Sequence, residues 1–336
     1  MNILRNIYSF FKNHIISILV ALIVVTGFSL YQLQRMDTSQ QSLLNPTYHF
    51  YFIGQNSVDP FWKEVRRGVT NAAKDYNVVV EFNAPRFNNP EEELKYLDMA
   101  ITSNVDGIIT HVSNGLASTE LINKAYNKGI PVVTIENDNK YSNRNAFVGT
   151  NSFLLGKEAA ELMVEATDAS SNIAIIVSSD FELDTASQNL RINGFLSTIK
   201  EYPEMKVIEV YTSEMGILSA EEITQAIITS RSEVDAIFTT NSVDTLGAAQ
   251  LIVDHNKVGE ILLVGYGNME NILRYIDRGI IYGTVMSEPY KMGYESLKAL
   301  MDIKETNNVS TFIDTGVKII KKSNLEEYQK SLESDD

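Results

Sequence analysis

The chain of 336 residues contains no cysteine. This absence excludes disulfide bonds, thiol nucleophiles, cysteine-based zinc sites and attachment of a lipid to an N-terminal cysteine. The soluble part must therefore fold on its hydrophobic cores alone. The hydrophobic fraction of 44% is sufficient for two cores in a chain of this length.

Positive charge is scarce. Lys and Arg number 28 against 43 Asp and Glu, which gives a net charge of -15. Proteins that bind nucleic acid usually present a basic face or stripe to the phosphate backbone, and no such stripe occurs in this sequence. Nucleic acid is therefore not an expected partner.

Motifs of common catalytic sites are missing as well. The sequence has no HExxH, GxSxG or P-loop lysine motif, and its 4 histidines are scattered. Gly265-Tyr266-Gly267 lacks the third glycine of a dinucleotide fingerprint. A carboxylate pair such as Asp59 and Glu136 is the remaining basis for an enzyme, namely a glycoside hydrolase. We expect a binding protein without a metal ion or cofactor, not an enzyme.

A long uncharged segment lies near the N-terminus. The run Asn13–Gln34 has no formal charge and is long enough, at about 1.5 Å per helical residue, to cross the ~30 Å hydrocarbon core of a bilayer. Arg5 and Lys12 precede it, which predicts a cytoplasmic N-terminus and an extracellular remainder. A cleaved signal peptide is the alternative, although the small-residue pattern at 26–31 is poor. We expect residues 1–45 to be a transmembrane anchor and tether of a single-pass cell-membrane protein.

After this segment, short apolar runs alternate with stretches of helical period, which is typical of repeated βα units around a parallel sheet. The runs predicted as strands are 48–53, 78–83, 107–110, 131–135, 173–177, 207–210, 236–240 and 261–264. Helices are expected at 61–75, 90–103, 116–127, 152–167, 185–199, 219–230, 242–255 and 269–278. The pattern restarts near 146–151, and two sheets in series are more economical than one very wide sheet. The sequence therefore predicts two α/β lobes.

Polar residues follow many of the predicted strands. Ligands of open parallel sheets bind beyond the carboxyl ends of the strands, so these positions are the candidates for a site. They are residues 55–59, 111–114, 136–138, 178–180, 241–242 and 266–268. Carboxylate, amide and guanidinium groups can each pair with two neighbouring polar groups of a ligand, while an aromatic ring covers an apolar face.

An ordered set of phrases in this sequence resembles the type I periplasmic sugar-binding proteins, the ribose-, xylose- and galactose-binding group. The phrases are IGQNSVDPFWKEVRRGVTNAAKDYNVVVEF at 53–82, NVDGIITHVSN at 104–114, GIPVVTIEND at 129–138, RINGF at 191–195, DAIFTTNSVDTLGA at 235–248 and ILLVGYGN at 261–268. Repressors of related fold carry a DNA-binding headpiece, and residues 1–45 do not read as one.

The resemblance implies the type I periplasmic binding protein fold, with two doubly wound parallel-sheet lobes joined by a three-strand hinge. Here it would follow one transmembrane helix. The first lobe would take residues 46–151 plus 288–316, and the second 152–287 plus 317–330, which leaves a tail at 331–336. Such lobes close around a sugar because contacts on both sides favour the closed state.

The resemblance also implies ligand residues in the first lobe. These are Asp59, Phe61, Trp62, His111, Glu136 and Asn137. Asp59 is also suited to cap the following helix, and the two aromatic rings are also suited to core packing. His111 stands where ribose binders have asparagine, and Asn137 stands where they have arginine. Asparagine cannot form the bidentate, charged hydrogen bonds of that arginine, which places ribose itself in doubt as the ligand.

In the second lobe, the implied ligand residues are Arg191, Met215, Asn241, Asn268 and Ser287. Arg191 is equally suited to a surface salt bridge and Asn241 to a helix N-cap. Gly267 stands where ribose binders have an acid, so that contact is either missing or supplied by Asn268. Glu288 is an alternative to Ser287 at the last crossover.

Within the group, the chain is most similar to membrane-anchored, D-xylose-binding sensors that pair with a LytS-type histidine kinase. This resemblance implies a receptor that closes on a pentose and signals to a membrane kinase to induce sugar uptake genes. A membrane-anchored solute-binding component of an ABC sugar transporter and an autoinducer-2 receptor are the alternatives. The short tether at 36–47 favours a fixed partner in the same membrane over a roaming one.

Overall fold

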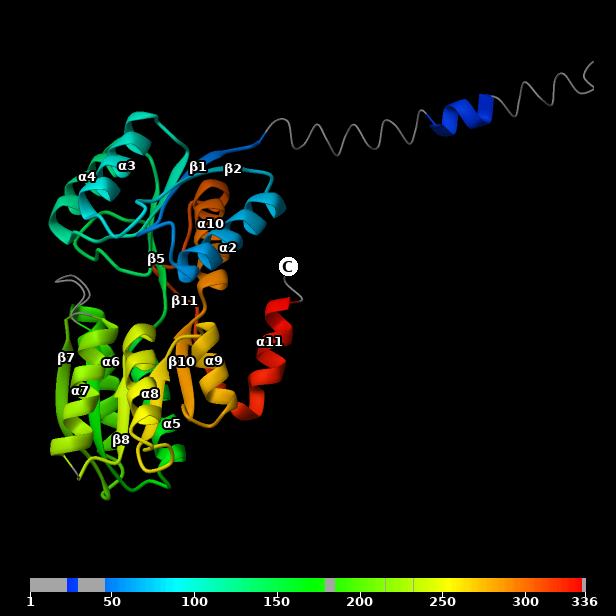
Figure 1. Ribbon diagram of the computed structural model, residues 1–336. Helices are drawn as coiled ribbons and strands as arrows, with labels where there is room; N and C mark the ends of the chain where they lie inside the picture. Colours follow the sequence, from blue (N-terminus) through cyan, green and yellow to red (C-terminus); the bar gives the residue numbers. More distant parts are fainter. Residues whose placement is uncertain (1–22, 30–45, 179–184, 215, 232, 334–336) are drawn as a thin grey trace, which may run out of the picture.

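The computed structural model describes residues 23–29, 46–178, 185–214, 216–231 and 233–333. The described chain forms two α/β lobes, one above the other in Figure 1. This confirms the predicted α/β architecture with two parallel-sheet lobes. We call the upper one lobe 1 and the lower one lobe 2.

The sheet of lobe 1 has six parallel strands in the order β11-β5-β4-β3-β1-β2. They are β1 (His49–Ile53), β2 (Val79–Asn83), β3 (Gly107–Thr110), β4 (Val132–Ile135), β5 (Ala146–Gly149) and β11 (Phe312–Asp314). Alternate residues of β1 face opposite sides, as the period of two requires. Phe50 and Phe52 pack under α2 (Pro60–Asp75) and α10 (Pro289–Thr306), while Tyr51 and Ile53 pack under α3 (Pro90–Thr102) and α4 (Gly115–Asn127).

The sheet of lobe 2 also has six strands, in the order β12-β10-β9-β8-β6-β7. They are β6 (Ser171–Ser178), β7 (Met205–Ser213), β8 (Ala236–Thr239), β9 (Leu262–Tyr266), β10 (Gly283–Ser287) and β12 (Val317–Lys321). One face carries α5 (Ser152–Ala166) and α6 (Thr185–Ile199). The other face carries α7 (Ile217–Ser230), α8 (Ser242–Asp254), α9 (Glu270–Asp277) and α11 (Leu325–Glu333), the last reached through the short helix η1 (Lys322–Asn324).

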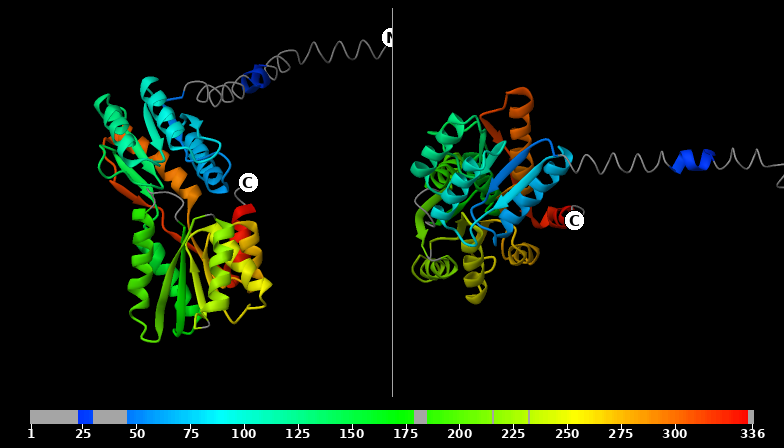
Figure 2. Two further views of the ribbon diagram at one scale, coloured as in Figure 1. Left: turned by 60° about the vertical axis from the view of Figure 1, so that its left-hand side comes forward. Right: turned by 90° about the horizontal axis from the view of Figure 1, so that it is seen from above.

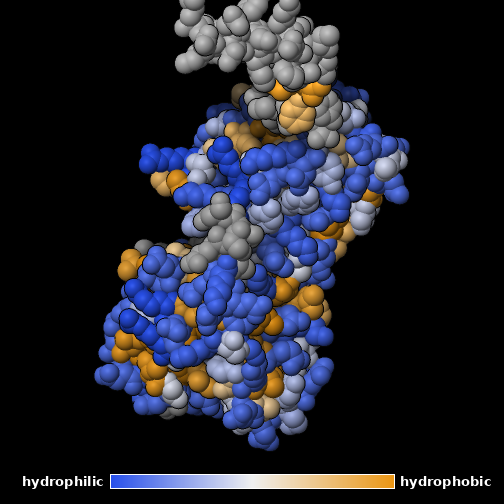
Figure 3. Space-filling view, turned by 90° about the vertical axis from the view of Figure 1, so that its right-hand side faces the viewer, coloured by the Kyte–Doolittle hydropathy of each residue, from blue (hydrophilic) through white to orange (hydrophobic). Residues whose placement is uncertain are grey.

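Strand β12 departs from the expected all-parallel sheet, because it runs antiparallel to β10. The chain enters β12 directly from β11 of lobe 1, without a helical crossover that would restore a parallel direction. The predicted tail at 331–336 overlaps α11, which continues to Glu333. Leu325 and Tyr328 of this helix are buried in the core of lobe 2, and this packing holds the helix in place. Figure 2 shows α11 on the flank of lobe 2, and Figure 3 shows that hydrophobic side chains on this flank gather mainly on lobe 2.

Three short connections join the lobes, from β5 to α5, from β10 to α10 and from β11 to β12. Two of them are hydrogen-bonded to each other. The Thr315 amide donates to the Gly149 carbonyl at 3.0 Å, and the Thr150 hydroxyl donates to the Gly316 carbonyl at 3.2 Å. All three connections leave strands at one edge of each sheet, so the hinge lies along that edge.

Each lobe contains one very close helix crossing built on two glycines. In lobe 1, a Cβ on Gly68 or Gly293 would lie 2.0 Å from a carbonyl oxygen of the facing helix, α10 or α2. In lobe 2, a Cβ on Gly156 of α5 would lie 1.8 Å from the Arg191 carbonyl oxygen, and one on Gly194 of α6 would lie 2.0 Å from the Phe153 carbonyl oxygen. Only glycine permits this approach of two backbones.

The predicted membrane span at 13–34 falls largely outside the described residues. Of this span, residues 23–29 are described and are helical. Across the part of the chain that the structure covers, no helix combines the length and apolar character needed to cross a bilayer.

Candidate ligand-binding cleft

The carboxyl edges of the two sheets face each other. Strand β5 leaves lobe 1 at its carboxyl end to enter lobe 2, and β10 leaves lobe 2 at its carboxyl end to enter lobe 1. Because the strands of a parallel sheet share one direction, the loops that follow β1, β3 and β4 lie opposite those that follow β8 and β9 (Figure 1). This is the region in which the sequence predicted the site.

The loop after β1 is organised by two polar side chains. Asp59 is the N-cap of α2, and its Oδ1 accepts from the Phe61 amide at 2.8 Å. Asn56 Oδ1 accepts from the Asp59 amide at 2.9 Å, and its Nδ2 donates to Asn88 Oδ1 at 2.7 Å. Asp59 itself is exposed, so its second oxygen remains accessible to a ligand. The sequence placed Asn56 in a candidate loop without selecting it, because its burial was not evident from its position among polar residues.

The two adjacent aromatic residues of α2 have different environments. Trp62 is only 5% exposed and packs against Phe52, against Phe61 at 5.3 Å between ring centroids, and against His111 at 5.2 Å. Its indole nitrogen donates to Gln55 Oε1 at 3.3 Å. Phe61 is only partly buried. Phe61 is therefore the ring that is available to stack on a ligand, while Trp62 forms the wall behind it.

A cavity of about 170 Å³ adjoins this wall on the side of β2. Phe52, Trp62 and Phe82 supply its aromatic lining, and Lys63 and Arg66 also line it. The Arg66 guanidinium lies 4.7 Å from the centre of the Phe82 ring.

His111 is 3% exposed, and both of its ring nitrogens face protein groups. Nδ1 lies 3.2 Å from Glu93 Oε2, and Nε2 lies 3.2 Å from Asn137 Nδ2. Ser113 donates to the other oxygen of Glu93 at 2.6 Å. Sequence reasoning missed Glu93, because Glu91, Glu92 and Glu93 together read as charges that complement the start of α3.

Glu136 and Asn137 form a tight turn after β4. Glu136 has a φ of 66°, and the Asn137 amide donates to the Ile135 carbonyl at 2.8 Å. A hydrogen bond from the amide of one residue to the carbonyl two positions earlier, with a positive φ at the residue between them, defines a γ-turn. This conformation is strained in any residue other than glycine. The surrounding structure must therefore hold this turn.

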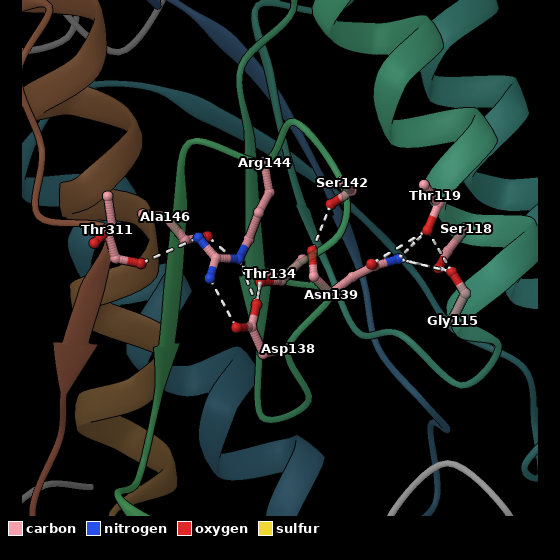
Figure 4. A network of polar contacts seen from close by, with 10 residues as sticks. All are labelled: Gly115, Ser118, Thr119, Thr134, Asp138, Asn139, Ser142, Arg144, Ala146 and Thr311. Atoms are coloured by element: carbon pink, nitrogen blue, oxygen red, sulfur yellow. Dashed lines mark hydrogen bonds and ion pairs between the residues drawn. The ribbon is translucent and has the colours of Figure 1, made fainter. Parts of the chain in front are cut away.

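Figure 4 shows the contacts that hold it. Arg144 pairs with both oxygens of Asp138, at 2.7 Å for Nη2 to Oδ2, and its Nη1 donates to the Thr311 carbonyl at 3.2 Å. On the other side, Asn139 Nδ2 donates to the Gly115 carbonyl at 2.9 Å, at the start of α4. The residues after the turn are thus fixed to β11 on one side and to α4 on the other.

On lobe 2, Arg191 lies against Tyr266. Its Cζ is 4.9 Å from the centre of the Tyr266 ring, and its Nη1 donates to the Thr240 carbonyl at 2.5 Å. Its Nε is buried and has no hydrogen-bond partner within the described chain. The guanidinium is therefore oriented by the protein yet retains donor capacity.

Charged side chains of both lobes influence the hydroxyl of Tyr266. Burial raises the pKa of its hydroxyl, the Glu136 carboxylate of lobe 1 raises it further, and Arg191 lowers it. The Tyr266 hydroxyl also lies 3.4 Å from Ser287 Oγ, at the end of β10. Sequence reasoning did not select Tyr266, although it placed this residue after a strand. Charged groups of both lobes therefore act on this hydroxyl, while the direct contact is the one between Arg191 and Tyr266.

The Asn241 amide is engaged within lobe 2. As the N-cap of α8, its Oδ1 accepts from the Asp244 amide at 2.8 Å, and its Nδ2 donates to Asp244 Oδ2 at 2.6 Å. The Asp244 carboxylate is fully buried and accepts from Ser213 at 2.8 Å.

Asn268 points to the C-terminal helix, because its Nδ2 donates to the Tyr328 hydroxyl of α11 at 2.8 Å. Ser287 is buried beside Tyr266, at 2% exposure. Met215 lies outside the described residues. In the described part of the chain, no group of three or more metal-ligating side chains is placed to hold a metal ion.

Residues 50–307 match the family model described as a periplasmic binding protein domain. The D-allose-binding periplasmic protein of Escherichia coli K12 is 22% identical over 259 residues, which cover 75% of this chain and 83% of that protein. The structure of GanP, a glucose-galactose binding protein from Geobacillus stearothermophilus, is 30% identical with a TM-score of 0.76, and the match covers 84% of this chain and 99% of that one. A chain of the XylFII-LytSN complex is 32% identical with a TM-score of 0.71, and the match covers 83% of this chain and 99% of that one.

Proposed function

This chain belongs to the periplasmic binding protein family, and since its relatives are sugar-binding proteins rather than enzymes, we propose that it is an extracytoplasmic monosaccharide receptor. The observation that carries the proposal is the Arg191 guanidinium of lobe 2, which lies against Tyr266 and has a buried Nε without a partner in the described chain, at the sheet edge that faces Asp59 and Glu136 of lobe 1. Lobe 1 thus supplies acceptors and lobe 2 a donor at the facing edges of the two sheets. A polyhydroxylated ligand that satisfies both sides stabilises the closed arrangement of the lobes.

The remaining groups suit a sugar ring. Asp59 and Glu136 accept from hydroxyls, Arg191 donates, and the partly exposed ring of Phe61 covers an apolar face. Polar groups that become buried when the lobes close also reject ligands that leave them unpaired.

Within this class we propose D-xylose or a closely related pentose as the ligand. The likeness to the XylFII chain supports this choice, as does the neutral Asn137 in place of the arginine of ribose binders. The presence of GanP among the similar structures makes hexoses the essential comparison in any test.

The proposed output is a signal to a membrane histidine kinase of the LytS type, which would induce sugar uptake genes. The likeness to a chain that is complexed with LytSN supports it. The uncharged run 13–34 supports a single-pass anchor with a cytoplasmic N-terminus and an extracellular binding domain. A receptor fixed by a short tether reaches a partner in the same membrane more readily than it reaches distant permeases.

The ligand is tested by titrating the full chain in detergent with a panel of sugars while following the fluorescence of Trp62, the only tryptophan. Since Trp62 packs between Phe61 and His111, closure of the cleft changes its surroundings. We expect a saturable change with D-xylose, and calorimetry on the same samples confirms binding independently. A response to hexoses or to autoinducer-2, with none to any pentose, would refute the ligand proposal.

The output is tested in cells by deleting the gene of the neighbouring histidine kinase and, separately, the genes of the neighbouring sugar permease. We expect kinase deletion to abolish sugar-dependent induction, as deletion of this receptor does. If induction survives without the receptor while sugar uptake fails, the chain is a component of an ABC transporter instead.

A further inference from the structure

Glu93 is a buried carboxylate with two neighbours that lie on one loop. It occupies the first turn of α3, is 4% exposed, and accepts from the Ser113 hydroxyl at 2.6 Å through Oε1. Its other oxygen lies 3.2 Å from His111 Nδ1. A carboxylate can only accept hydrogen bonds. The hydrogen in this contact must therefore be on His111 Nδ1.

The other ring nitrogen, Nε2, faces a hydrogen-bond donor instead of an acceptor. Nε2 lies 3.2 Å from Nδ2 of Asn137, which can only donate. Nε2 must therefore hold a lone pair, which makes His111 a neutral ring protonated on Nδ1. The ring has little freedom to turn, because it is buried and packs edge-on against Trp62 at 5.2 Å.

The chain of contacts ends at the proposed ligand site. With Nδ2 of Asn137 directed at His111, Oδ1 lies on the side of the amide away from the ring, and the second N–H of the amide stays available as well. We infer that Glu93 is a positioning residue, which fixes the tautomer of His111 and thereby presents Asn137 to the ligand as a hydrogen-bond acceptor. This inference rests on the proposed sugar-binding function and specifies it, because the ligand must offer a hydroxyl hydrogen at this point.

Removal of Glu93 changes the hydrogen bonds of His111 Nδ1. Without Glu93, the Ser113 hydroxyl, 3.3 Å from Nδ1, has lost its own acceptor and donates to Nδ1, so the ring carries its proton on Nε2 instead. Nε2 would then donate, and the Asn137 amide would have to turn its oxygen toward the ring and its NH₂ group toward the cleft. The site would change from an acceptor to a donor without the loss of any residue that faces the ligand.

The direct test measures the protonation of His111 by nitrogen–proton NMR on the full chain in detergent, with histidine labelled by ¹⁵N. The other 3 histidines are distinguished by comparison with His111→Asn. We expect a proton on Nδ1 and none on Nε2 in the unliganded protein, and movement of the proton to Nε2 in Glu93→Ala. A wild-type ring protonated on Nε2, or on both nitrogens, overturns the inference. Because no sugar is present, this result does not depend on the proposed function.

The second test measures the affinity for D-xylose by calorimetry in three variants. Glu93→Gln keeps an acceptor for His111 and offers its NH₂ group to Ser113, so it should remain within about fivefold of wild type. Glu93→Ala should bind about tenfold more weakly, which corresponds to about one hydrogen bond. Glu92→Ala is the matched control, since Glu92 accepts only locally from Tyr96 at 2.7 Å, and it should bind normally.

Each variant is checked for cooperative unfolding before its affinity is measured. A folded Glu93→Ala protein that binds D-xylose as tightly as wild type contradicts the inference. If Glu93→Ala does not fold, Asn137→Asp replaces it in the NMR experiment. Its carboxylate oxygen beside Nε2 favours a second proton there while Glu93 still holds the one on Nδ1, so a ring protonated on Nε2 alone contradicts the inference. Failure of every pentose to bind wild type rejects the proposed function and leaves the NMR result standing.

Discussion

Gly156 and Arg191 lie at the point where α5 and α6 touch backbone to backbone, and a Cβ on Gly156 would be 1.8 Å from the Arg191 carbonyl oxygen. The backbone of Arg191 thus packs directly against Gly156 of α5, the helix that follows the connection from β5. The position of Arg191 therefore depends on the spacing of two helices as well as on its own hydrogen bond to Thr240.

Substitution Gly156→Ala should push α6 away from α5 and move Arg191 out of place. The expected cost in unfolding free energy is about 1–3 kcal/mol, as for overpacking elsewhere in cores. Sugar affinity should fall as well. Gly129→Ala is the matched control, because its φ of 73° makes the substitution strained while no atom lies within 4 Å of the added Cβ, so no helix is displaced. Equal loss of affinity in both variants, measured below their unfolding temperatures, would show that Arg191 is not the residue affected.

Substitution Arg144→Met should loosen the turn that carries Glu136 and Asn137. Arg144 is 13% exposed and holds Asp138 through two contacts, so its loss should weaken sugar binding by about tenfold, or about 1.4 kcal/mol. Calorimetric titration measures the effect. Lys124→Met removes an exposed pair with Asp98 and should change binding little, because surface ion pairs contribute about 0–1 kcal/mol. Unchanged affinity in Arg144→Met would mean that the γ-turn is stable without the clamp.

Substitution Tyr328→Phe should release α11 from the loop after β9. It removes the acceptor for Asn268 Nδ2, at a cost of about 1 kcal/mol, and should speed hydrogen exchange in residues 325–333. Tyr275→Phe removes a bond of similar length to Gln250 in the same lobe. That control should lose comparable stability without faster exchange in α11. Identical exchange patterns in the two variants would argue against a specific role for the Asn268 contact.

Alkaline pH should reveal the bond between Tyr294 and Asp75. The Asp75 carboxylate accepts from the Tyr294 hydroxyl at 2.9 Å and, together with burial, raises the pKa of Tyr294 to about 12. An unfolded tyrosine has a pKa of about 10, so between about pH 10 and 12 only the unfolded state loses this proton. The contribution is complete below about pH 10 and is lost as the pH rises through that window.

Urea unfolding at pH 9 and pH 11 measures this effect. Wild type should lose more stability between the two values than Tyr294→Phe does. Tyr126→Phe, at a position that is 55% exposed, should follow wild type. Parallel loss in all three proteins would show that other groups control alkaline stability.

Much of the fold could be predicted because local patterns dominate it. Strand β3 has the predicted limits Gly107–Thr110, since a short apolar run between turn residues has few alternatives. Asn89 with Pro90 likewise predicted the start of α3, and Asn89 Oδ1 accepts from the Glu92 amide at 3.2 Å. The antiparallel direction of β12 was not predictable in the same way, because it depends on where the chain returns from lobe 1.

The candidate site was predictable at the level of loops but not of individual partners. The positions after strands carry the polar groups as expected. The partner of Asn268, however, lies 60 residues away on α11, and that of His111 lies 18 residues away on α3. Both partners are common surface residue types, so only the three-dimensional structure distinguishes them from their neighbours.

The three connections between the lobes lie along one edge of each sheet, with β11 in lobe 1 and β12 in lobe 2 at that edge. Five strand spacings of about 4.8 Å separate β11 from β2, so the far edge is about 24 Å from the hinge. A rotation of about 10° there shifts β2 by about 4 Å and barely moves the edge at the connections. A partner that contacts β2 therefore meets a much larger displacement than a partner bound beside the connections between the lobes.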